Sequence, residues 1–266
     1  MKRIFLFILI SVFLADMCYA GVQVVGGLTR ENTVKPGDSL TGDIILFNTG
    51  NEPEEVKIYK TDYFFRADGS TKYSIPGSEA RSNSSWITLS PSRVTIPPRE
   101  KMTVHYEIHV PNASNLTGTY WSLLMVEPKL NAMPEGLNNS TGSGVGIKTL
   151  VRYAIQMVSN VSDTGLRNIR FLSKKVLKQD GKKILQIDIE NSGERGLTPD
   201  LWAELYDEKG NLVKRVDSGK KRIYPGTSVR YCIDLSGIPL GNYKTVIVAD
   251  NGDDHIFGAQ YDLTLI

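Results

Sequence analysis

The chain has 266 residues, with 31 Lys and Arg against 29 Asp and Glu, which gives a formal net charge of +2 at pH 7. This near balance gives the protein no overall attraction to nucleic acid. Hydrophobic residues make up 41% of the chain, and the length is sufficient for two domains that bury cores without disulfides or metals. We therefore expect a protein whose stability comes from packing.

The first twenty residues predict a secretory signal peptide. A basic start at Lys2 and Arg3 precedes an apolar run over residues 4–14 and a small-residue exit that ends at Ala20. The run is shorter than the roughly 20 residues that a membrane span needs, so a permanent anchor is the weaker alternative. Lipidation at Cys18 is also the weaker alternative, because the residues before it match such sites poorly. Cleavage after Ala20 is the predicted outcome.

The predicted mature chain keeps 29 basic residues (31 − 2) and 28 acidic residues (29 − 1), a net charge of +1. It also keeps one cysteine, Cys232, which excludes an intramolecular disulfide. No later segment has the pattern of a membrane span. We expect a periplasmic or otherwise extracytoplasmic protein.

Alternation of apolar and polar residues predicts an essentially all-β chain. Residues 102–110 alternate so that every second side chain is apolar, the period of a half-buried strand. The same pattern returns in residues 185–190, 201–206 and 229–235, and no comparable stretch has helical spacing. Turn residues such as Pro36-Gly37 and Pro225-Gly226 separate these runs at short intervals. Such a rhythm is typical of β-sandwiches.

A weak internal repeat predicts two tandem immunoglobulin-like β-sandwich domains, over residues 21–160 and 161–266. Asn48-Thr49-Gly50 is echoed by Asn191-Ser192-Gly193, and Gly118-Thr119-Tyr120 by Gly241-Asn242-Tyr243. Each tyrosine opens an apolar strand, where immunoglobulin-like domains often place a tyrosine whose hydroxyl bonds back to the chain. Ordinary core packing explains the two tyrosines equally well.

The residues that commonly carry catalysis are few. His105 and His109 lie on the polar face of one strand, with backbones about 13 Å apart at a rise of roughly 3.3 Å per residue, too far to share a metal. His255 follows an Asp-rich turn that lacks the closing glutamate of a calcium loop. No nucleophile elbow, glycine-rich phosphate loop or zinc-protease motif occurs. We expect no enzyme, no metal and no cofactor.

Six glycosylation sequons occur, and we favour their interpretation as ordinary loop and turn residues over glycan acceptors. They begin at Asn83, Asn112, Asn115, Asn138, Asn139 and Asn160.

The segment with the clearest features of a binding element follows the first domain's apolar strand. Residues 129–146 have the composition of a mobile loop, rich in Gly, Asn and Ser. Residues 145–157 then predict a strand, and its simplest interpretation is the last strand of a sandwich. An edge strand of this kind also pairs with a strand of another chain. The predicted partner-binding residues are Val145, Ile147, Val151 and Tyr153.

The order of these parts resembles the periplasmic pilus-assembly chaperones, which carry two immunoglobulin-like domains behind a signal peptide. The resemblance implies a basic anchor for a partner's terminal carboxylate, with Arg30 on the first strand and Lys148 or Arg152 on the last. The first domain is also similar to the WxL-interacting family of bacterial surface proteins. That similarity lies in Val34-Lys35-Pro36-Gly37, Asn48-Thr49-Gly50, residues 86–91, residues 94–98 and Val110-Pro111 before Gly118.

These observations favour a non-enzymatic, chaperone-like protein that binds a β-rich pilus or surface subunit by strand addition. The alternative is a structural or adhesive module that recognises a surface polymer or protein through loops at the ends of the sandwiches. Neither hypothesis involves nucleic acid or a membrane span after signal cleavage.

Overall fold

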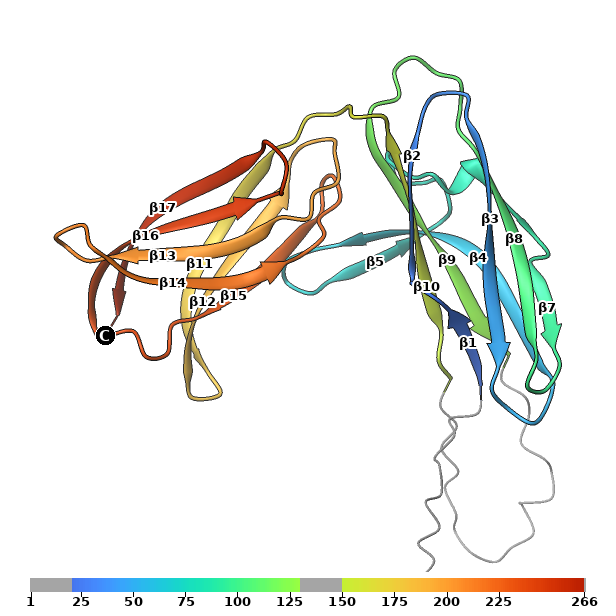
Figure 1. Ribbon diagram of the computed structural model, residues 1–266, viewed down its shortest axis with the longest axis horizontal. Coiled ribbons are helices and arrows are strands. Elements are labelled where there is room, and N and C mark those ends of the chain that lie inside the picture. Colours follow the sequence, from blue (N-terminus) through green and yellow to red (C-terminus); the bar gives the residue numbers. More distant parts are fainter. Residues whose placement is uncertain (1–20, 130–149, 266) are drawn as a thin grey trace, which may run out of the picture.

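The structure is a computed structural model that describes residues 21–129 and 150–265. The predicted signal peptide, the predicted loop beyond Lys129, and Val145, Ile147 and Lys148 lie outside these ranges. The described residues form strands and one short 3-10 helix, η1 (Ser84–Trp86). None of their helices is long and apolar enough to cross a membrane. The predicted fold class is confirmed, because the strands form two tandem immunoglobulin-like sandwiches (Figure 1).

The first sandwich packs a four-stranded sheet against a six-stranded sheet, which we call the β10 sheet. The four-stranded sheet has the order β1 (Val22–Val25), β3 (Ser39–Asn48), β8 (Lys101–His109) and β6 (Ile87–Ser90). The β10 sheet has the order β2 (Thr29–Val34), β10 (Tyr153–Val161), β9 (Gly118–Pro128), β4 (Glu54–Phe65) and β5 (Thr71–Ser74), with β7 (Arg93–Ile96) also paired to β4. Among the strands that the structure describes, only β2 and β10 pair in parallel.

The predicted alternation appears directly as burial in this sandwich. In β8, Val104, Tyr106 and Ile108 are buried while His105 and Glu107 are exposed. The core cluster draws its side chains from both sheets, since burying one face of each strand removes its apolar side chains from water.

The second sandwich encloses a separate core. Its three-stranded sheet has the order β11 (Ile169–Gln179), β12 (Lys182–Asn191) and β15 (Ser228–Asp234). Its four-stranded sheet has the order β14 (Leu212–Lys220), β13 (Asp200–Tyr206), β16 (Gly241–Asp250) and β17 (Ile256–Leu265). The core cluster lies wholly within residues 169–265. Independent folding of the two halves, with a boundary near residue 160, stays a prediction.

The predicted strand over residues 145–157 needs correction in its described part. Residues 150–152 are not strand, and β10 runs from Tyr153 to Val161. Pairing with β9 spans the whole of β10, with Val126 opposite Tyr153 at one end and Gly118 opposite Val161 at the other, whereas Glu127 and Pro128 of β9 pair only with β4. Periodicity marks which residues alternate, whereas backbone pairing with the neighbouring strand determines which of them are strand.

The two tyrosines of the repeat differ in the contacts that they make. The Tyr243 hydroxyl donates to the carbonyl oxygen of Pro239 at 2.8 Å, which makes a tyrosine corner. The ring of Tyr120 instead packs against Trp86, with centroids 4.7 Å apart. Each of the two predicted explanations therefore holds for one domain.

The sandwiches meet through an aromatic cluster and through the β4–β5 hairpin, which reaches across to the second sandwich (Figure 1). Trp121 of β9 stacks on Tyr224 with ring centroids 4.8 Å apart and planes inclined by 11°. At the tip of the hairpin, Arg66 donates to the carbonyl of Gly226 at 2.9 Å, and the Ala67 N–H donates to Ser228 Oγ at 2.9 Å. These contacts fix the second sandwich against the outer face of the β10 sheet.

Candidate functional site

The first residues of β10 have an open edge. β10 pairs with β9 from Tyr153 onward, but β2 begins to pair with β10 only at Gln156, opposite Thr29. The Gln156 N–H donates to the carbonyl of Leu28 at 2.8 Å, on the side where β2 lies. Backbone groups alternate in direction along a strand, so those of Ala154 point to the same side. Among the described residues, no strand lies beside Ala154 on this side and no backbone group pairs there with its N–H or C=O.

Apolar side chains surround this open edge. Leu28, which precedes β2, is 42% exposed, and Val151, which precedes β10, is 51% exposed. Ile155 is buried in the core, and Tyr153 packs against the same core from a partly exposed position. A strand added here meets open backbone groups and apolar side chains together, which is the combination that strand addition uses.

The structure describes two of the four residues predicted to bind a partner. Tyr153 is the first residue of β10, and Val151 lies before the strand begins. Val145 and Ile147 lie outside the described residues. The described pair therefore flanks and begins the open edge.

The predicted carboxylate anchors Arg30 and Arg152 are not brought together. Arg30 is in register with buried Met157 on the core side of the sheet, and its Nη1 donates to the carbonyl of Gly27 at 2.5 Å. Arg152 lies 3.9 Å from Glu127, on the outer face. Five residues of extended chain separate Arg152 from Met157, a span of roughly 16 Å. Lys148 lies outside the described residues, so an anchor that joins Arg30 to a basic residue of the last strand stays a prediction.

Residues that the sequence analysis missed connect the open edge to the second sandwich. The Tyr224 hydroxyl donates to Gln156 Oε1 at 2.7 Å, at the point where β2 pairing begins. Burial raises the pKa of Tyr224 to about 12, so the hydroxyl keeps its proton. Beside it, Arg222 is ion-paired with Glu31 of β2 at 2.9 Å. No local pattern identifies these residues, because their partners lie far apart in the chain.

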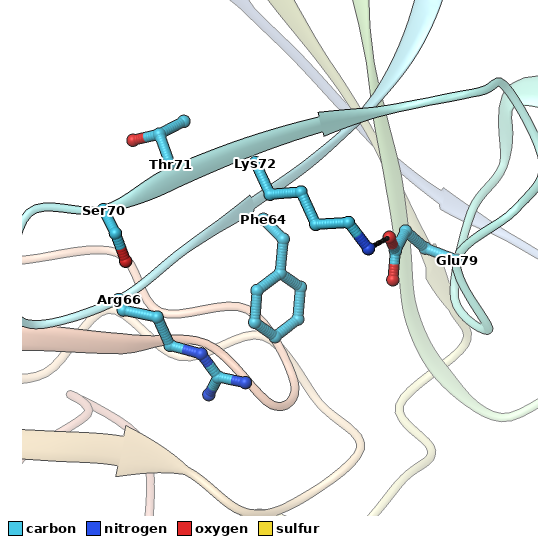
Figure 2. Close-up of a pocket in the computed structure, with 6 residues that line it drawn as sticks. All are labelled: Phe64, Arg66, Ser70, Thr71, Lys72 and Glu79. Atoms are coloured by element: carbon cyan, nitrogen blue, oxygen red, sulfur yellow. Dashed lines mark hydrogen bonds and ion pairs between the residues drawn. The ribbon is translucent and has the colours of Figure 1, made fainter.

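A pocket of about 350 Å³ lies on the β4–β5 hairpin (Figure 2). In it, Lys72 is ion-paired with Glu79 at 2.8 Å. The guanidinium of Arg66 lies over the ring of Phe64, 4.5 Å from its centroid. Because Arg66 also bonds to Gly226, this pocket belongs to the contact between the sandwiches. The lining residues are Phe64, Arg66, Ser70, Thr71, Lys72 and Glu79.

The histidines have local partners. His105 lies 2.6 Å from Asp43, and His109 lies 3.0 Å from Glu107. Within residues 21–129 and 150–265, no group of three or more His, Cys, Asp or Glu side chains is placed to hold a metal ion. His255 lies beside Asp253 in its turn.

Two of the predicted sequons have structural roles. Asn83 is fully buried, where its Nδ2 donates to the carbonyl of Met157 at 3.0 Å. Asn160 is also buried, and its Nδ2 donates to Glu31 at 2.8 Å. Asn112 and Asn115 are exposed, while Asn138 and Asn139 lie outside the described residues.

No family model and no curated protein sequence matches the chain. Among solved structures, it is similar to a chain of the chaperone–tip adhesin complex of CFA/I fimbriae, with 15% identity, a TM-score of 0.48, and coverage of 93% of this chain and 100% of that chain. It is similar to the class 5 fimbriae chaperone CfaA, with 15% identity, a TM-score of 0.46, and coverage of 92% and 100%. It is also similar to a chain of the CsuC–CsuE complex of Acinetobacter baumannii, with 12% identity, a TM-score of 0.42, and coverage of 79% and 89%.

Proposed function

We propose that this chain is an extracytoplasmic, chaperone-like protein that captures a β-rich pilus or surface subunit by strand addition along the first residues of β10. The class of partner follows the resemblance found in the sequence. The strand register supports the proposed place of binding, since residues 153–155 pair with β9 but not with β2.

The open backbone of Ala154 is the observation that carries this proposal. A partner strand laid beside it continues the β10 sheet in the direction that β2 occupies farther along. Main-chain hydrogen bonds supply affinity, and the side chains of Leu28 and Val151 supply apolar contact. A partner of this kind must itself present an extended segment with alternating apolar residues.

Substitution of Ala154 by proline tests the proposal. Proline removes the one N–H that points to the open side, and it is tolerated at sheet edges where that group faces solvent. Ala154→Ser is the matched control, because it keeps the N–H and changes the side chain little. We expect a β-rich subunit to co-purify from the periplasm with the wild type and with the serine variant, and not with the proline variant. All three should unfold at similar temperatures.

Hydrogen exchange adds a readout at the proposed site. In the complex, the amide of Ala154 should exchange far more slowly than in the free protein. A complex in which this amide exchanges as fast as before would contradict strand addition. Binding lost through changes in loops at the sandwich ends, with Ala154→Pro binding normally, would favour the adhesive-module alternative.

A further inference from the structure

The hairpin formed by β11 and β12 ends in a concentrated basic tip. Residues 173–183 contain five lysines and one acidic residue, Asp180, a net charge of +4 (5 − 1) in a chain whose total is +2. β12 pairs with β15 only from Ile184 onward, so the tip is a two-stranded ribbon that projects from the second sandwich (Figure 1). The tip is therefore a strongly basic point that projects from the second sandwich.

The register of this ribbon places like charges together. Lys178 lies directly opposite Lys183 across the two strands. Side chains in such pairs are about 5 Å apart at Cβ, and like charges there destabilise a hairpin. Lys182 has a counter-charge in Asp234 at 3.1 Å. Lys175 and Lys178 have no ion pair among the described residues. The charges of Lys175 and Lys178 are therefore not offset by an ion pair among the described residues, and an anionic partner would offset them.

The lysines lie on both faces of the ribbon. Lys178 and Lys183 share the face of Val176, which is in register with buried Leu185, whereas Lys175 and Lys182 lie on the opposite face. Lysines on both faces suit a planar anionic surface that the tip approaches, because such a surface attracts the charges of either face. Val176 is 40% exposed beside these lysines and supplies apolar contact at such a surface.

From these observations we infer that the β11–β12 tip binds the surface of a membrane that contains anionic phospholipid. The lysine ammonium groups lie near the lipid phosphates, and the attraction depends on ionic strength because the charges are exposed. The binding is peripheral and involves no spanning segment. It is independent of strand addition, since the tip and the open edge of β10 belong to different sandwiches.

Vesicle sedimentation tests this inference with the whole mature protein. The probes are vesicles of phosphatidylcholine alone and of phosphatidylcholine mixed with phosphatidylglycerol. We expect binding only to the mixed vesicles, and its loss in salt of about 1 M, where the Debye length falls to roughly 3 Å. The triple variant Lys175→Gln, Lys178→Gln, Lys182→Gln should weaken binding on the order of 100-fold, given the usual contribution of each lysine at an anionic surface.

A second triple variant provides the matched control. Lys209→Gln, Lys214→Gln and Lys220→Gln make the same change in net charge at exposed positions around β14. This variant should bind the mixed vesicles within a few-fold of the wild type. Equal losses in both variants would show an effect of net charge alone and overturn the assignment to the tip. No binding by the wild type, or binding to soluble polyglutamate but not to vesicles, would overturn the membrane surface as the partner.

Discussion

The Asn48 turn of the first sandwich is held by the side chain of its buried asparagine. Asn48 Nδ2 donates to the carbonyl of Glu52 at 2.7 Å and to that of Ile96 at 3.0 Å. Its Oδ1 accepts from the Gly50 N–H at 2.8 Å. The side chain thus holds the turn that follows the last residue of β3.

The Asn191 turn of the second sandwich repeats this arrangement. Asn191 Nδ2 donates to the carbonyl of Arg195 at 2.7 Å and to that of Ile223 at 3.0 Å, and its Oδ1 accepts from the Gly193 N–H at 2.9 Å. In both turns the first acceptor lies four residues after the asparagine, and the second lies in a distant part of the same sandwich. The weak sequence repeat therefore marks a real structural one.

The surroundings of the two turns differ. The first turn bonds within its own sandwich, where the Thr49 N–H donates to the carbonyl of Gly21 at 2.9 Å. The second turn bonds to the other sandwich, since the carbonyl of Glu194 accepts from the Thr119 N–H at 2.9 Å. The Gly196 N–H also donates to Thr119 Oγ1 at 2.7 Å. The same local motif thus makes hydrogen bonds within its own sandwich in the first domain and forms part of the domain junction in the second.

Removing either of the two asparagine side chains should cause the largest loss of stability. Asn48→Ala and Asn191→Ala each delete three buried or partly buried hydrogen bonds and leave carbonyl groups without a partner, so each should lower the free energy of unfolding by about 4 kcal/mol. Urea unfolding measures both. Small-angle scattering should show a larger radius of gyration for Asn191→Ala only. Equal radii for the two variants would show that the second turn does not hold the junction.

Substitution of a glycine at the junction between the sandwiches should cause the next largest loss of stability. Gly118 has φ +73°, and a Cβ there would overlap the carbonyl oxygen of Glu194 in the second sandwich. Gly118→Ala should cost about 3 kcal/mol, from the left-handed backbone and from the overlap. Gly210 is the matched control, because it has φ +84° and open space around it. Gly210→Ala should cost only about 1 kcal/mol.

If the two glycine variants unfold at the same urea concentration, the approach of Glu194 to Gly118 contributes nothing to stability. A larger loss in Gly118→Ala supports a junction in which backbone meets backbone.

Much of the fold could be predicted because alternation is a local property. In β8 and β12 the apolar positions that share a face are the ones that become buried. The repeated Asn-x-Gly and Gly-x-Tyr motifs are also local, and each lies at an equivalent place in its sandwich. For these elements the period of two determines the buried face, whatever the neighbouring strand is.

The open edge of β10 and the junction could not be predicted in this way. The edge exists because β2 begins opposite Gln156. The sequence of neither strand alone predicts this parallel register. Arg30 faces the core side for the same reason. Trp121 and Tyr224 stack although about a hundred residues separate them, so no pattern in either segment signals the contact.

A buried carboxylate should make the first sandwich sensitive to acid. Burial of Asp62 raises its pKa, but the hydroxyls of Ser82 and Ser84 and the Glu79 N–H donate to it, and the result is a pKa below the ordinary 3.8. A carboxyl group whose pKa is lower in the folded state stabilises the fold fully when the pH is above its pKa in the unfolded chain. This stabilisation is lost as the pH falls through the pKa of the folded state. We expect the full contribution above about pH 4 and a loss below it.

The variant Asp62→Asn tests this sensitivity. It should cost about 2 kcal/mol at neutral pH and should remove part of the acid dependence of urea unfolding between about pH 5 and pH 2. A profile that is the same for the wild type and Asp62→Asn would mean that other carboxyls cause the acid response.

Removing the hydroxyls of the two repeated tyrosines should cause the smallest changes in stability, and the two changes should differ. Tyr243→Phe removes the hydroxyl that donates to Pro239, and it should lower the free energy of unfolding by about 1 kcal/mol, the usual net value of one hydrogen bond. Tyr120→Phe keeps the ring packed on Trp86 and should change stability by only a few tenths of a kcal/mol. Urea unfolding of both variants measures the difference. If Tyr120→Phe costs as much as Tyr243→Phe, the Tyr120 hydroxyl has a structural role as well, and the two domains are more alike than their contacts indicate.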